Sequence, residues 1–62
     1  MTIQELYRIL LDSEEVVIMT NMNFVEWRGF TKDIPYRFFD YLIDSIYSTS
    51  DSGESYIIII LK

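Results

Sequence analysis

The sequence predicts a small α+β domain of the order α-β-β-α-β, with two helices packed on one face of a three-stranded, mainly antiparallel sheet. Apolar residues recur at helical spacing near the amino terminus and again after Pro35. Runs rich in β-branched residues occupy 15–20 and 56–61, and turn formers separate these segments. We expect one domain, 1–62, because a chain this short buries only about 60% of its unfolded surface and supports one core.

The first helix is expected to begin at Thr2. Thr2 and Glu5 have the spacing of a capping box, in which each side chain satisfies a backbone N–H of the first turn. One apolar stripe follows at helical spacing, formed by Ile3, Leu6, Tyr7 and Leu10. The helix is expected to end near Asp12 or Ser13.

The next two segments predict a hairpin. Residues 15–20 are apolar on both sides, which is typical of a strand covered on more than one side. The turn formers at 21–23 tolerate positive φ and lead into a second strand over 24–30. Alternation along this second strand predicts Val25 and Trp27 on its inner face.

A second helix is expected from Asp33, which has an N-capping side chain, through Pro35 in the first turn. Its inner face is predicted to contain Phe38, Phe39, Leu42, Ile43 and Ile46, and its outer face Arg37, Asp40, Asp44 and Ser48. The Ser, Asp and Gly residues of 48–55 predict a mobile loop, and 56–61 predicts the third strand.

The third strand also predicts self-association. Residues 57–61 are apolar on both faces, but both expected helices lie on one face of the sheet. A solvated apolar strand favours aggregation. We therefore expect a homodimer or another partner to cover the second face.

Composition excludes several classes of function. The chain has no Cys, so it has no disulfide and no Cys nucleophile. It also has no His, the side chain that most often acts as a general base. Its net charge of −5 opposes direct binding to nucleic acid or an anionic membrane and favours a basic protein partner. The sequence predicts neither a signal peptide nor a membrane span. We expect a cytoplasmic protein that is not an enzyme and uses no metal or cofactor.

Two groups of residues are candidates for partner binding. The outer face of the second helix would present a row of carboxylates resembling phosphates, although a solvated face with intrahelical ion pairs to Arg37 explains the same pattern. Aromatic residues that fall off the main apolar faces are candidate contact anchors. The predicted partner-binding residues are Phe24, Glu26, Phe30, Asp33, Arg37, Asp40, Tyr41 and Asp44. The adjacent Glu14 and Glu15 indicate exposed loop charges more than an acid–base pair.

The layout of residues 1–6 (MTIQEL), 15–18 (EVVI), 29–35 (GFTKDIP) and the late isoleucine strand resembles small early or accessory proteins of phages that infect Gram-positive bacteria. Several such proteins inhibit bacterial immunity, including small acidic anti-CRISPR proteins that occupy the nucleic-acid-binding surface of an effector nuclease. The resemblance implies a non-catalytic inhibitor that binds a CRISPR effector or another nucleic-acid-binding defence protein in the host bacterial cytoplasm. The alternative is a small homo-oligomeric structural, assembly or regulatory accessory protein of a phage or mobile element.

Overall fold

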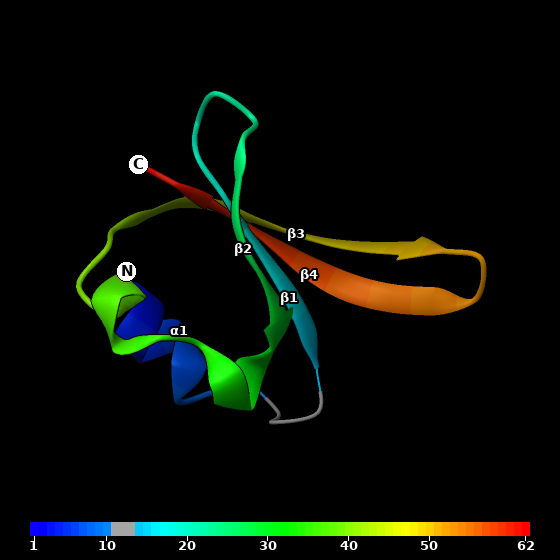
Figure 1. The fold of residues 1–62 in the computed structure, drawn as a ribbon, viewed down its shortest axis with the longest axis horizontal. Coiled ribbons are helices and arrows are strands. Elements are labelled where there is room, and N and C mark those ends of the chain that lie inside the picture. The colour runs from blue at the N-terminus through cyan, green and yellow to red at the C-terminus, as the bar shows by residue number, and fades with distance from the viewer. Residues whose placement is uncertain (11–13) are drawn as a thin grey trace.

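The strands form one mixed sheet, in the order Val25–Phe30 (β2), Glu15–Met19 (β1), Glu54–Leu61 (β4) and Ile43–Asp51 (β3). The computed structural model describes residues 1–10 and 14–62, and of Asp51 only the backbone. Its elements are α1 (Ile3–Tyr7), β1 (Glu15–Met19), β2 (Val25–Phe30), the 3-10 turns η1 (Thr31–Asp33) and η2 (Tyr36–Phe38), β3 (Ile43–Asp51) and β4 (Glu54–Leu61). The central strands β1 and β4 are parallel, and the outer pairs β1–β2 and β3–β4 are antiparallel hairpins. Figure 1 shows α1 and the 3-10 turns together at one side, with the β3–β4 hairpin extending away from them.

The predicted α-β-β-α-β order with a three-stranded sheet and two helices is wrong. The second predicted helix is replaced by two 3-10 turns and strand β3, so the described residues form a four-stranded sheet and one short helix. The apolar residues between 38 and 46 fit a helical period, but short apolar runs also fit a strand. Residues from Ile43 onward pair with β4 along its length, from Ile43↔Leu61 to Asp51↔Glu54. Pairing with a distant strand therefore overrode the local pattern.

The predicted mobile loop over 48–55 is also wrong, because these residues form the tip of the β3–β4 hairpin. Ser52 and Gly53 make its two-residue turn, and both have positive φ, 52° and 83°. The parallel pairing of β1 with β4 begins only at Val16↔Ile57, so the tip extends beyond β1 (Figure 1). Both faces of the tip meet solvent there, which explains why its strands are polar and resemble a loop in sequence.

The start of the first helix is confirmed. Thr2 Oγ1 accepts from the Glu5 backbone N–H at 3.3 Å, and the Thr2 N–H donates to Glu5 Oε1 at 2.9 Å, which completes the capping box. The helix is shorter than predicted, because α1 ends at Tyr7 with Arg8 as its C-cap. The predicted end near Asp12 or Ser13 lies outside the described residues.

The core lies between one face of the sheet and a layer made of α1 and 31–38. Its buried apolar side chains are Ile3, Leu6, Val16, Ile18, Ile34, Phe38, Ile59 and Leu61. Thr31 is also fully buried, and its backbone N–H and its Oγ1 both donate to the Glu14 carbonyl, at 2.9 and 3.1 Å. These bonds attach the covering layer to the start of β1.

The predicted β1–β2 hairpin is confirmed, but the predicted inner position of Val25 is wrong. A register shift between Ile18 and Met19 pairs Ile18 with Trp27 and Met19 with Val25. The extra residue of this bulge turns Val25 to the opposite face, where it is 59% exposed. Trp27 is half-buried and packs against the core as predicted.

The sheet face opposite α1 carries apolar side chains, as the isoleucine run predicts. Ile58 lies between Val17 of β1 and Tyr47 of β3 in the register, and Ile60 follows two residues later on the same face. Both isoleucines are half-buried, whereas Tyr47 is 55% exposed. The homodimer that would cover this face stays a prediction. In the described ranges 1–10 and 14–62, no helix is long and apolar enough to cross a membrane.

Candidate functional site

Two hollows lie at opposite ends of the sheet, and the first is an acidic cleft of about 520 Å³. The cleft forms because β1 begins at Glu15, whereas β3 and β4 remain paired as far as Asp51↔Glu54. In the described part of the chain, the start of β4 therefore has no paired strand on its β1 side. The cleft combines carboxylates with aromatic rings, namely those of Glu14, Glu15, Glu54, Phe30, Tyr47 and Tyr56.

An ion pair lies beside the acidic cleft. Glu15 Oε1 accepts from Nε and from a terminal nitrogen of Arg28, both at 2.9 Å. The Arg28 guanidinium also lies 5.7 Å from the centroid of the Tyr56 ring. The hydrogen bond from Arg28 to Glu15 is the main cause of a raised pKa at Arg28. Arg28 thus offsets one of the three carboxylates of the cleft.

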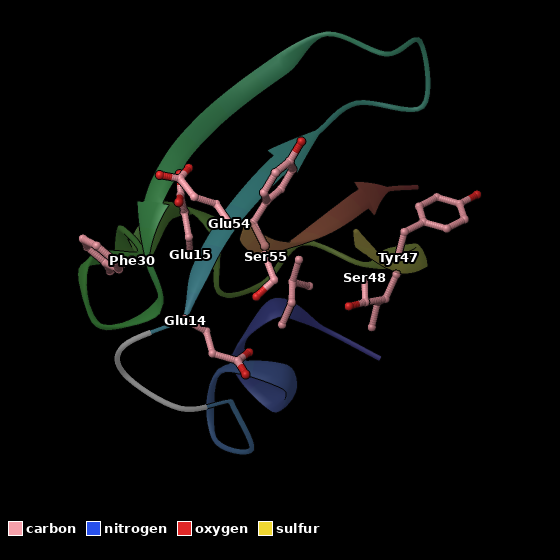
Figure 2. Close-up of a pocket in the computed structure, with 10 residues that line it drawn as sticks. Glu14, Glu15, Phe30, Tyr47, Ser48, Glu54 and Ser55 are labelled. Atoms are coloured by element: carbon pink, nitrogen blue, oxygen red, sulfur yellow. The ribbon is translucent and has the colours of Figure 1, made fainter. Parts of the chain in front are cut away.

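Glu14 differs from the other carboxylates of the acidic cleft. Figure 2 shows its side chain pointing in the opposite direction from those of Glu15 and Glu54, as expected for consecutive residues entering a strand. Its Oε2 atom is shielded from solvent and has no hydrogen-bond partner among the described residues. An unpaired buried oxygen of this kind costs folding free energy.

The second hollow is an apolar groove of about 420 Å³ at the far end of β1 and β4. Its exposed apolar side chains come from the β1–β2 turn and from the segment before β3: Met22, Phe24, Tyr41 and Leu42. Buried Leu61 contributes to its floor, and Glu26 and Lys62 are its charged members. An exposed apolar group beside charged residues is a common feature of protein interaction sites.

Local structure holds both walls of the apolar groove. On one side, Asn23 has φ of 68°, and Thr20 Oγ1 accepts from the N–H groups of Met22 and Phe24, each at 3.2 Å. On the other side, the Tyr41 ring packs edge-on against buried Phe38, with centroids 5.4 Å apart. The groove is therefore largely preformed.

The structure brings together some of the predicted partner-binding residues and separates others. Phe24, Glu26 and Tyr41 all line the apolar groove, although they come from distant parts of the chain. Phe30 lies at the acidic cleft, at the opposite end of the sheet.

The predicted acidic helix face does not form, because the structure has two 3-10 turns and strand β3 where the second helix was predicted. Asp33 lies in η1, Arg37 in η2, Asp40 in the following turn and Asp44 in β3, and all four are exposed. The Arg37 guanidinium lies 4.5 Å from the Phe38 ring centroid. Among the described residues, Arg37 makes no ion pair with an Asp.

Sequence reasoning missed Met22 and Leu42 in the apolar groove. Met22 did carry a signal, because an apolar side chain within a turn of asparagines has no route into the core. It is 73% exposed. Leu42 gave no such signal, because helical spacing predicted it on an inner face.

No protein family model, curated protein or solved structure matches this chain. Within the part of the chain that the structure describes, no group of three or more Asp or Glu side chains is placed to hold a metal ion. The apolar groove combines the aromatic side chains of Phe24 and Tyr41 with one carboxylate, that of Glu26.

Proposed function

We propose that the chain is a non-catalytic inhibitor that binds a basic protein at the apolar groove, and that its target is a bacterial immune nuclease of the CRISPR type. One observation supports the apolar groove as the contact surface. Phe24 and Tyr41 both line this groove, together with exposed Met22 and Leu42. Exposed aromatic side chains in a preformed hollow are typical energetic centres of protein interfaces.

The charge of the chain supports a basic partner. Glu26 lines the apolar groove, and Asp40 and Asp44 lie within two residues of Leu42 in the chain. Together with the net charge of −5, these carboxylates would attract the positive surface with which a nuclease holds nucleic acid. The choice of a defence nuclease rests on the resemblance to phage accessory proteins.

Binding of purified CRISPR effector nucleases to immobilised protein tests the proposal, with Phe24→Ala as the diagnostic variant. Truncation of a central aromatic contact costs about 2 kcal/mol, so we expect about 30-fold weaker binding. Tyr36→Ala is the matched control, because Tyr36 is an exposed aromatic residue outside the groove. We expect the control to bind within about twofold of the unchanged protein. The proposal fails if no nuclease binds, or if both variants weaken binding equally.

A second candidate is a homo-oligomeric accessory protein, and the uncovered sheet face favours it. That face carries Val25, Ile58 and Ile60, and its Glu15 and Arg28 neutralise each other. A second copy would approach it with little charge repulsion. A monomer by light scattering at micromolar concentration rules out this candidate, because it requires a dimer in the absence of any nuclease.

A further inference from the structure

The outer edge of β3 has backbone groups that are unpaired among the described residues. β3 is the last strand of the sheet, and β4 occupies only its inner side. Asp51 and Glu54 flank a two-residue turn, so they form a hydrogen-bonded pair, and the pairing alternates along β3 from there. The N–H and C=O groups of Ile46, Ser48 and Ser50 therefore point away from β4, about 7 Å apart along the strand.

The middle of this edge lacks the features that normally block pairing with another strand. Ile43–Asp51 contains no Pro, Lys or Arg, and its two carboxylate residues and its register shift lie near its ends, at Asp44, Asp51 and between Ile43 and Ser45. The opposite edge, β2, is six residues long, carries Glu26 and Arg28, and has a bulge beside Val25. β3 is nine residues long and is the more open of the two edges.

The chain itself already adds an extended segment to the same edge. Residues 1–3 run antiparallel to 41–43, with a bridge between Thr2 and Leu42. The Ile3 N–H donates to the Tyr41 carbonyl at 3.0 Å, and the Ile43 N–H donates to the Met1 carbonyl at 2.9 Å. The edge beyond Ile43 continues this line of backbone groups without such a partner in the described part of the chain.

Charge indicates what would occupy this edge. Residues 43–54 contain Asp44, Asp51 and Glu54 and no basic residue. Pairing with a second copy would bring two such hairpins together, and their like charges would repel. Exposed Ile46 and Tyr47, on opposite faces of β3, offer apolar contacts to alternate side chains of an added strand.

We propose that the outer edge of β3 binds an extended, basic segment of another protein as an added strand. This site is separate from the apolar groove and does not depend on the identity of the target proposed above. Backbone hydrogen bonds to Ile46, Ser48 and Ser50 hold the segment, and a lysine or arginine side chain of the segment lies near Asp44.

The test is titration of the whole chain, labelled with ¹⁵N, with the peptide acetyl-KVKVKVK-amide at low salt. We expect shifts of the Ile46, Ser48 and Ser50 amides and slower hydrogen exchange at these three positions. Acetyl-EVEVEVE-amide should cause no such change. The lysine peptide N-methylated at alternate residues, on the side that faces β3, should not bind because it lacks the required N–H groups.

Ser48→Pro is the diagnostic variant, because proline is tolerated on an edge strand where the lost N–H faces outward. It should weaken peptide binding by at least about tenfold, since it removes one hydrogen bond and obstructs its neighbours. Ser48→Thr retains the N–H and should bind within about twofold.

Three results overturn the proposal. The first is the absence of exchange protection at the three outward amides, and the second is equal binding by the proline and threonine variants. The third is a dimer of the unchanged protein, measured by sedimentation, that Ser48→Pro dissociates, because the edge then binds a second copy. If Ser48→Pro does not fold, equal binding of the N-methylated and unmethylated peptides to the unchanged protein refutes the proposal.

Discussion

Gly29 lies beneath the only tryptophan of the chain, and replacing it with alanine should destabilise the protein. A Cβ atom at position 29 would lie 2.8 and 2.9 Å from two carbons of the Trp27 ring. Carbon atoms in contact normally lie about 3.5–4.0 Å apart, so the ring must move by roughly 1 Å. Trp27 is half-buried and packs against the core, so this movement disturbs other contacts.

The expected loss of stability is about 1 kcal/mol. Overpacking of this kind costs about 1–3 kcal/mol. Replacing glycine with alanine also lowers the conformational entropy of the unfolded chain, which stabilises the folded state by about 0.4–1 kcal/mol. Urea unfolding followed by circular dichroism measures the net change, and Trp27 fluorescence reports movement of the ring.

Gly53→Ala is the matched control. Apart from its chain neighbours, no described residue lies within 4 Å of a Cβ at Gly53, but its φ of +83° is costly for alanine. We expect a loss of about 1 kcal/mol from backbone strain, with the native Trp27 emission unchanged. The two variants should therefore resemble each other in stability and differ in fluorescence.

A double variant separates the clash from other effects at Gly29. In a Trp27→Leu background the large ring is absent, so Gly29→Ala should cost little or should stabilise slightly. The reasoning is refuted if Gly29→Ala unfolds at the original urea midpoint with unchanged emission, because the ring would then not lie over Gly29.

Two further predictions concern glutamates. Glu14→Met should raise the free energy of unfolding by about 1 kcal/mol, because it removes the buried Oε2, which has no hydrogen-bond partner among the described residues. Glu54→Met is the control, because Glu54 is exposed. A lower urea midpoint for Glu14→Met than for the unchanged protein contradicts this prediction. Hydrogen bonds from Thr2 lower the pKa of Glu5, so the folded state favours the Glu5 carboxylate. The resulting contribution to stability is present above about pH 4.3, the ordinary pKa of glutamate, and is lost as the pH falls through the lower pKa of the folded state. The difference in melting temperature between the unchanged protein and Glu5→Gln should therefore shrink between about pH 7 and about pH 3, and a constant difference rules out this role.

Local signals predicted the first half of the fold well. Thr2 and Glu5 interact within one helical turn, and the turn formers at 21–23 join two adjacent strands, so few distant contacts are needed. Val25 shows where this reasoning fails, because a bulge against Met19 reversed its face. Alternation in one strand carries no information about an extra residue in the pairing.

The candidate site was predictable only in part. Phe24 and Tyr41 were proposed as contact residues because they fall off the main apolar faces, and both line the apolar groove. Their proximity was not predictable, because it depends on β1 and β4 lying side by side in parallel. Leu42 and Asp44 were misplaced for a related reason, since both were predicted on a helix that does not form.

The sequence by itself determined the start of α1, the β1–β2 hairpin and the net charge of −5. It also determined the absence of cysteine and histidine chemistry, because composition requires no fold. Only the tertiary structure decided that Ile43–Asp51 is a strand, and with it the location of the groove and of the open edge. The apolar spacing there fits both a helix and a strand, and the choice between them depends on backbone pairing with β4. The start of β4 is fixed by a two-residue turn, which could not be recognised in the sequence because the serine-rich residues around it resemble a loop.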